Sequence, residues 1–194
     1  MPFQKINGVQ LFYEDEGRGE PVLLLHGAFS TARGQFGHIM ERLHERGYRV
    51  IAPDRRGYGR SRPPEPDYPV DFYRRDMEDM AALLAALDAQ PAHVVGISDG
   101  GVIGLLLAIQ HPDAVRSLVC WAANVAWPED ERGLYENLRD ATQSREFMEL
   151  MRERHGMTRT EARAMLDSYV QASLDLTEGK WEPGLAGHLD EIRC

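Results

Sequence analysis

The sequence predicts an α/β protein: a mostly parallel β-sheet with helices on both faces. Short continuous apolar runs such as 22-VLLLHG-27 and 92-AHVVGIS-98 are typical of strands that are buried on both sides of a parallel sheet. Between these runs lie segments with apolar residues at helical spacing. Alternating strands and helices of this length indicate βαβ units with right-handed crossovers. The 194 residues suffice for one domain with a sizeable core.

The N-terminal part of the chain alternates between strand and helix patterns. These are a half-buried strand at 9–14, a buried strand at 22–27, a helix at 36–47 and a further strand at 48–54. Within the predicted helix, Ile39, Met40 and Leu43 lie at helical spacing, and Gly47 is a typical stop signal.

The pattern repeats after the proline-rich loop 62-RPPEPDYP-69. It comprises a helix with a stripe at Tyr73, Met77, Met80, Leu84 and Leu87, a strand at 92–98, a helix at 100–111 and a strand at 115–123. From about Asn124 the chain becomes polar and helical, with a capping-box pattern at 158-TRTE-161 and no strand pattern between 128 and 176. We predict a core at 1–123 and a helical insertion at 124–190.

Charge and composition exclude several classes of function. The net charge of −9 argues against nucleic acid or an anionic membrane surface as a partner, and no apolar run is long enough to span a bilayer. The start of the chain has no apolar signal segment, and Cys120 and Cys194 give no disulfide framework. We therefore expect a cytoplasmic protein with two free thiols; the oligomeric state stays open.

Motifs for metals and cofactors are missing from the sequence. There is no H-E-x-x-H pattern and no cysteine pair at ligand spacing, and 44-HERGY-48 lacks a second histidine. Gly57-Tyr58-Gly59 is not followed by the third glycine of a dinucleotide fingerprint. We expect neither a metal nor a cofactor.

The stretch 94-VVGISDGG-101 places Ser98 in a Gly-x-Ser-x-Gly pattern between a predicted strand and a predicted helix. This context is typical of a nucleophile elbow, in which a tight turn lifts the serine hydroxyl above the carboxyl edge of the sheet. The adjacent helix N-terminus would favour a negative charge there. The alternative is an ordinary glycine-rich turn with a capping serine. We predict that Ser98 is a catalytic nucleophile.

A second stretch, 25-LHGAFS-30, ends a strand with His-Gly close to the same edge. Its backbone could donate one N–H to an oxyanion, so we predict that the N–H groups of Ala28 and Asp99 form an oxyanion hole. His26 invites a role as a base. We prefer the interpretation that it orders the loop by hydrogen bonding.

These motifs together resemble the α/β-hydrolases. The residues that carry the resemblance are LLLHG, 53-PDRRGYGRS-61, GISDGG and 110-QHPDAVRSLV-119; DFYRRDMEDM and CWAAN favour the valacyclovir hydrolase (biphenyl hydrolase-like) branch. The resemblance implies a serine hydrolase of small carboxylic esters, in which residues 124–190 form a helical cap. It also implies that the acid and the histidine of a triad follow later strands, so we expect them beyond Cys194 and expect this chain to lack the last strands.

No residue within the chain is an evident substitute for the missing triad members. The end of the strand before the cap reads 121-WAANVAW-127 and has no carboxylate. The remaining histidines, including His155, are better explained as surface or capping residues. We expect the chain alone to be nearly inactive. Two alternatives remain: a carbon–carbon bond hydrolase of the same fold, and an inactive fragment that only binds ligand.

Asp99 carries a charge next to the predicted nucleophile. Its side chain is either exposed to solvent or paired with an arginine such as Arg33 or Arg55. The family resemblance implies a third role, recognition of a substrate α-ammonium group. Under that hypothesis the partner of this protein is a small α-amino acid ester.

Overall fold

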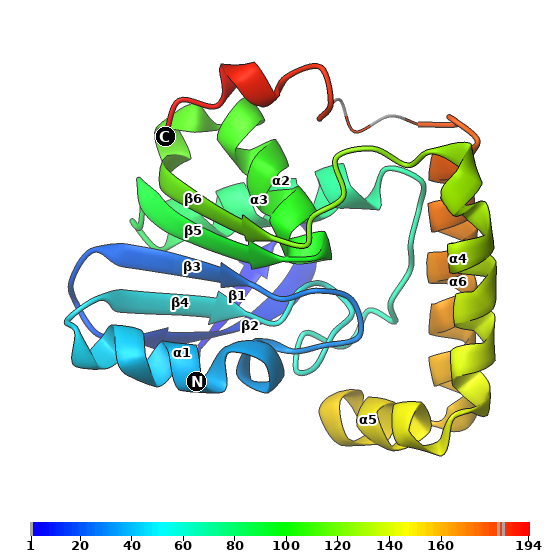
Figure 1. Cartoon of the computed structure of the whole chain (residues 1–194). Coiled ribbons are helices and arrows are strands. Elements are labelled where there is room, and N and C mark those ends of the chain that lie inside the picture. Colours follow the sequence, from blue (N-terminus) through cyan, green and yellow to red (C-terminus); the bar gives the residue numbers. More distant parts are fainter. Residues whose placement is uncertain (1, 182, 184) are drawn as a thin grey trace.

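The computed structural model describes residues 2–181, 183 and 185–194. Its described strands form one sheet in the order β1-β2-β4-β3-β5-β6 (Figure 1). Their bounds are β1 Phe3–Ile6, β2 Val9–Glu16, β3 Pro21–Leu25, β4 Arg49–Pro53, β5 Ala92–Ile97 and β6 Val115–Trp121. The pairs β3–β4, β3–β5 and β5–β6 are parallel, whereas β1–β2 and β2–β4 are antiparallel. The predicted mostly parallel sheet is confirmed, with an antiparallel hairpin at one edge.

Helices cover both faces of the sheet. Successive side chains of a strand point to opposite faces, so a strand of apolar residues needs a covering layer on each face. Residues Val22 and Leu24 of β3 pack with α1 (Ala32–Glu45) on one face. On the other face, Leu23 and Leu25 belong to the large core that includes α2 (Phe72–Ala86) and α3 (Asp99–Gln110). Figure 1 shows α1 on the side of the sheet opposite α2 and α3.

Helix α1 begins earlier than the sequence pattern predicts. The Thr31 hydroxyl accepts a hydrogen bond from the Gly34 N–H and caps the helix, so that Ala32 is its first residue. The buried face is therefore formed by Ala32, Phe36 and Met40. Ile39, one of the apolar residues at helical spacing, lies off this face and is 43% exposed.

The chain after β6 is helical, as predicted. It contains α4 (Arg132–Leu138), α5 (Arg145–His155), α6 (Arg159–Thr177) and the short 3₁₀ helices Glu129–Glu131, Arg139–Gln143 and Leu189–Glu191; a further one, Pro112–Ala114, precedes β6. The predicted capping box is present, with Thr158 and Glu161 each accepting from the other's backbone N–H. Figure 1 shows α4 and α6 side by side at one end of the sheet, with α5 below them. We call residues 124–177 the helical segment.

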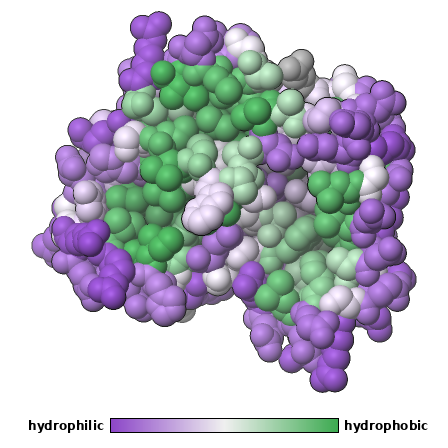
Figure 2. All heavy atoms as spheres, in the orientation of Figure 1, coloured by the Kyte–Doolittle hydropathy of each residue, from purple (hydrophilic) through white to green (hydrophobic). Residues whose placement is uncertain are grey.

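Strand β6 is one edge of the sheet formed by the described strands, and β1 is the other. The β6 side chains Val119 and Trp121 are 59% and 73% exposed, so this apolar strand is uncovered. Hydrophobic side chains gather over this part of the core and on the facing side of the helical segment, with a hollow between them (Figure 2). Within the described residues, no helix has the length and apolar character to cross a membrane.

Candidate active site

Ser98 lies between β5 and α3, at the carboxyl edge of the sheet. Its backbone angles, φ 54° and ψ −123°, are strained for a residue with a side chain. Two hydrogen bonds stabilise this strained conformation. The Ser98 N–H donates to the Trp121 carbonyl at 2.8 Å, and the Ser98 carbonyl accepts from the Gly101 N–H at 2.8 Å. The predicted strand-to-helix turn is therefore present and has the geometry of an elbow.

The two glycines of the Gly-x-Ser-x-Gly pattern are required by close backbone approach. A Cβ on Gly96 would lie 2.2 Å from the Gly100 carbonyl oxygen. A Cβ on Gly100 would lie 2.0 Å from the Leu25 carbonyl oxygen, at the end of β3. The alternative of an ordinary capping turn does not fit, since the Ser98 side chain makes no capping hydrogen bond to α3.

The loop after β3 reaches the elbow at Gly27. A Cβ on Gly27 would lie 3.1 Å from the Ser98 Cβ, so the two backbones are in contact here. Ala28 is the next residue along the loop, and Asp99 is the first residue of α3, where a helix leaves N–H groups without an acceptor of its own. The structure thus places Asp99 directly after Ser98, and Ala28 directly after the glycine that contacts Ser98.

His26 is fully buried and orders this loop, as the sequence analysis preferred. Its Nδ1 lies 2.8 Å from the Gly27 carbonyl oxygen, and its Nε2 lies 3.0 Å from the Arg55 N–H nitrogen. Because a carbonyl can only accept and an N–H can only donate, Nδ1 carries the proton and Nε2 accepts. Burial, reinforced by the charge of Arg55, lowers the pKa of His26 well below its ordinary value. The ring is therefore neutral, and neither nitrogen is available to Ser98.

The Asp99 side chain is buried, with only 2% of the residue exposed. Its Oδ1 accepts from the Tyr73 hydroxyl at 2.9 Å and from the Tyr169 hydroxyl at 3.0 Å, while Oδ2 lies 3.4 Å from a guanidinium nitrogen of Arg55. Arg55 also pairs with Asp76 at 3.0 Å. Of the predicted positions for this carboxylate, solvent exposure is therefore wrong and the ion pair with Arg55 is present.

Two features of this buried cluster determine its charge. Burial, and after it the charge of Asp99, raises the pKa of Tyr73 and of Tyr169 well above the ordinary range, so both hydroxyls stay protonated and donate. Burial lowers the pKa of Arg55, but Tyr58 and the two carboxylates raise it by more than burial lowers it, so the guanidinium stays charged. One buried guanidinium is thus shared by two carboxylates, Asp76 and Asp99. The other predicted partner, Arg33, pairs with Glu14 instead.

A cavity of about 140 Å³ opens beside Ser98. It is lined by Tyr73, Ser98, Asp99, Val102, Ala122, Asn124, Leu134, Tyr135 and Tyr169. Its walls come from the elbow, from α2 and from the helical segment, and no histidine is among them. The described residues contain no cluster of three or more histidine, cysteine or acidic side chains that could hold a metal ion.

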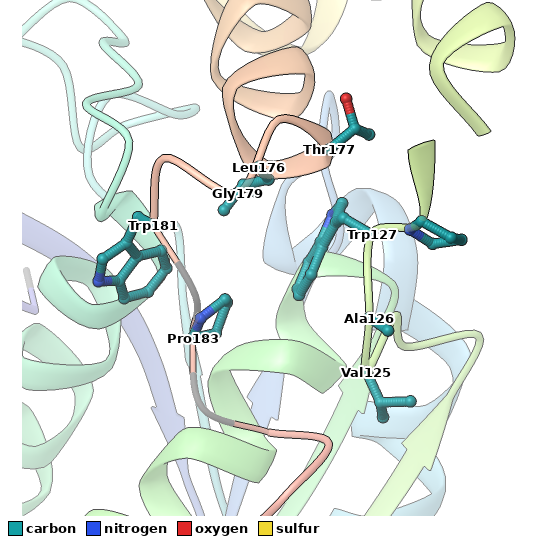
Figure 3. Close-up of a pocket in the computed structure, with 9 residues that line it drawn as sticks. Val125, Ala126, Trp127, Leu176, Thr177, Gly179, Trp181 and Pro183 are labelled. Atoms are coloured by element: carbon teal, nitrogen blue, oxygen red, sulfur yellow. The ribbon is translucent and has the colours of Figure 1, made fainter. Parts of the chain in front are cut away.

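A second, larger cavity of about 250 Å³ lies at the end of α6 and does not include Ser98. Figure 3 shows Trp127 and Trp181 on two sides of it, with Leu176 near its upper end. The Trp127 ring lies 5.6 Å from the Tyr73 ring, and Tyr73 also lines the cavity beside Ser98. The two cavities are therefore neighbours, but only the smaller one holds groups suited to chemistry.

His155 was predicted to be a surface or capping residue, which is wrong. It ends α5 but is only 5% exposed, and its Nδ1 accepts from the Gly59 N–H at 3.0 Å. Burial lowers its pKa to about 4. This contact is not predictable from local patterns, because the two residues are 96 positions apart.

Comparison with known proteins agrees with this geometry. Over residues 20–175 the sequence matches the family described as alpha/beta hydrolase fold. The chain belongs to this family. It is 38% identical over 138 residues to the serine hydrolase BPHL of Homo sapiens, a match that covers 71% of this chain and 47% of that protein. It is also 38% identical over 128 residues to the 2-hydroxymuconate semialdehyde hydrolase of Pseudomonas sp. (strain CF600), covering 64% and 44%.

Solved structures show the same fold. A structure from a study of carboxylesterases of Nitrososphaera gargenis superposes with a TM-score of 0.75 at 21% identity, covering 100% of this chain and 77% of that one. An esterase of Exiguobacterium antarcticum superposes with a TM-score of 0.68 at 23% identity, covering 90% and 72%. The predicted fold and the resemblance to the biphenyl hydrolase-like branch are confirmed. The chain spans less than half the length of the two relatives matched by sequence.

Proposed function

We propose that this chain carries the nucleophile of a serine hydrolase that cleaves small carboxylic esters through an acyl-enzyme. The observation that carries the proposal is the strained Ser98 at the start of α3, beside the cavity of about 140 Å³. Ser98 would attack the ester carbonyl, and the N–H groups of Ala28 and Asp99 would stabilise the oxyanion. The helical segment would serve as the cap over this site.

The serine needs a base, and no described histidine can serve as one from its present position. Both nitrogens of His26 are engaged, and the cavity beside Ser98 has no histidine in its walls. A working enzyme therefore needs a histidine and an acid beyond those placed here. We expect the 194-residue chain by itself to hydrolyse esters far more slowly than a complete relative. If the 194-residue chain and a complete relative turned over a standard nitrophenyl ester at the same rate, this expectation would be contradicted.

Labelling with a fluorophosphonate tests the nucleophile. In the complete protein, the probe should label wild type and leave Ser98→Ala unlabelled. Ser117→Ala removes a serine from β6, away from the elbow, and is the matched control that should label like wild type. Equal labelling of wild type and Ser98→Ala would show that another residue is the nucleophile.

Within this function, we propose that Asp99 selects esters with an α-ammonium group. The negative charge of a carboxylate beside the nucleophile repels the developing oxyanion and so raises the barrier. The positive charge of a cationic substrate offsets this repulsion. Oδ1 of Asp99 already accepts two hydroxyls, whereas Oδ2 has only Arg55 at 3.4 Å and keeps room for one more donor. Asp76 also pairs with Arg75 at 3.4 Å, whereas Arg55 is the ion-pair partner of Asp99 among the described residues. A cation in the cavity would add a second ion pair to Asp99.

Asp99→Asn should lower kcat/KM for α-amino esters about tenfold to a hundredfold, as expected for a lost charge-assisted hydrogen bond. Neutral esters should change little or react faster. Asp76→Asn is the control, because it removes the other carboxylate on Arg55 but does not line the cavity. If both ester classes fall together in Asp99→Asn, Asp99 has only a structural role.

A second candidate function is hydrolysis of a carbon–carbon bond on the same fold. What favours it is the likeness to the 2-hydroxymuconate semialdehyde hydrolase. A panel of α-amino esters, neutral esters and vinylogous diketones separates the two candidates. A third possibility, ligand binding without turnover, would appear as binding of these compounds with no Ser98-dependent product.

A further inference from the structure

The loop that carries Ala28 contains a glycine held by side chains on both sides. A side chain at Gly27 would be tightly packed, because its Cβ would lie 3.1 Å from the Ser98 Cβ and 3.2 Å from the Ile97 carbonyl oxygen. Glycine is also the residue with the greatest backbone freedom. A flexible residue directly before the proposed oxyanion donor would let that donor reorient. The peptide planes before and after Gly27 therefore need hydrogen bonds from side chains to fix them.

The first support is Gln35, on the second turn of α1. Its Oε1 accepts from the Gly27 N–H at 2.9 Å, which fixes the peptide before Gly27. Gln35 is half-buried, and no motif in the sequence marks it as a functional residue.

The second support is His26, which fixes the peptide after Gly27. Its Nδ1–H donates to the Gly27 carbonyl oxygen at 2.8 Å, while its Nε2 is anchored by the Arg55 N–H. The Gly27–Ala28 bond is not among the cis peptides, and in a trans peptide the N–H points away from the carbonyl. Because the Gly27 carbonyl points toward the buried imidazole, the Ala28 N–H of the same peptide points away from that imidazole. Within the described residues this N–H has no protein acceptor.

The next residue closes the other side of the donor. Phe29 adopts a left-handed conformation, with φ 58°. Its ring packs edge-on against Phe147 of α5 at 5.6 Å and Tyr169 of α6 at 5.1 Å. Ala28 is thus fixed between a hydrogen-bonded glycine and a strained, packed phenylalanine.

We propose that Gln35 and His26 are positioning residues that hold the Gly27–Ala28 peptide with its N–H directed at the oxyanion of the Ser98 adduct. This rests on the proposed serine hydrolase function. Neither residue touches the substrate. Their effect is preorganisation: the donor is in place before charge develops and does not have to reorient.

The decisive variant is Gln35→Met, which keeps the length of the side chain and removes the acceptor. In the complete enzyme kcat should fall about tenfold or more, with KM changed less than threefold, because an oxyanion donor acts mainly in the transition state. Affinity for a boronic acid inhibitor, which mimics the tetrahedral adduct, should weaken in parallel with kcat. Gln35→Asn, which draws the amide back by one methylene, should behave similarly and replaces Gln35→Met if that variant does not fold.

Gln90→Met is the matched control. Gln90 also makes one hydrogen bond, to the Ala81 carbonyl, but lies before β5 and so at the opposite end of that strand from Ser98. It should leave kcat and inhibitor affinity unchanged. Hydrogen exchange of the Gly27 amide gives a readout without turnover: Gln35→Met should speed it at least tenfold, and Gln90→Met should not.

The outcomes separate the two levels of the argument. If hydrolysis does not depend on Ser98, the proposed function fails, whatever Gln35 does. If hydrolysis depends on Ser98 but Gln35→Met keeps kcat within twofold of wild type, the function stands and the positioning role is overturned. A fall in kcat that is matched by an equal loss in Gln90→Met also overturns it, because the effect is then general destabilisation.

Discussion

Replacing Gly100 by alanine tests whether the elbow is held by backbone contact. The new Cβ would lie 2.0 Å from the Leu25 carbonyl oxygen and 2.8 Å from the His26 carbonyl oxygen. The first distance is about 1.4 Å short of the 3.4 Å at which ordinary contact begins, and both atoms are backbone. The end of β3 or the start of α3 has to move, and neither is free, because β3 pairs with strands on both sides.

We expect Gly100→Ala to lower the free energy of unfolding by about 3 kcal/mol, at the upper end of the cost of overpacking. Gly104→Ala is the matched control in the same helix. Its Cβ would meet the Leu118 Cδ1 at 3.0 Å, a movable side-chain end, and alanine gains about 1 kcal/mol of helix propensity over glycine. That variant should stay within about 1 kcal/mol of wild type.

Urea unfolding of the 194-residue chain, followed by tryptophan fluorescence, measures both changes. A variant that forms no cooperatively folded state while Gly104→Ala folds also agrees with the expectation. If Gly100→Ala and Gly104→Ala differ by less than about 1 kcal/mol, the elbow tolerates a side chain at this position and the contact argument is refuted.

Three further perturbations act on other parts of the molecule. Arg55→Met leaves Asp99 buried without its cation and Asp76 with Arg75 alone, and should cost about 3–5 kcal/mol in urea unfolding; a loss below about 1 kcal/mol would mean that the Asp99 carboxylate is solvated. Thr158→Ala removes the cap of α6 and should cost about 1 kcal/mol; an unchanged midpoint would show that this end of the helix adds no stability. Between its ordinary pKa of 6.5 and about 4, His155 binds a proton in the unfolded chain but not in the folded one, so stability falls as pH falls through this window. His155→Gln should remove on the order of 2 kcal/mol of the fall between about pH 7 and about pH 5, and an unchanged pH dependence would contradict the assignment.

The sequence predicts the elbow well because its determinants are local. Gly96, Ser98 and Gly100 lie within five residues, and the strand before them and the helix after them are each recognisable from their own patterns. The loop at His26 is predictable only in part. Its Nδ1 bonds to the next residue, Gly27, whereas its Nε2 accepts from Arg55, 29 positions away.

The surroundings of Ser98 are not predictable in this way, because their contacts join distant parts of the chain. Tyr73 and Tyr169 reach Asp99 from 26 and 70 positions away. No spacing rule links these residues, and each tyrosine alone is explained as one apolar position in a helix stripe. The start of α1 shows a related limit: the helix pattern is right, but the cap at Thr31 and the buried Ala32 extend the helix and its buried face N-terminally beyond it.

The contacts between α6 and the elbow affect how strongly Asp99, next to Ser98, attracts a cation. Tyr169 belongs to the helical segment, yet its hydroxyl bonds to Asp99 and its ring packs against Phe29, beside the proposed oxyanion donor. With the segment in place, Asp99 is 2% exposed, and its attraction for a cation is screened far less than in water. If the segment moved away, water would reach the carboxylate and weaken that attraction. If Asp99 binds an ammonium group as proposed, its binding and the closed position of the helical segment would be coupled: the bound ammonium would stabilise the closed arrangement to the same extent that closure strengthens its binding.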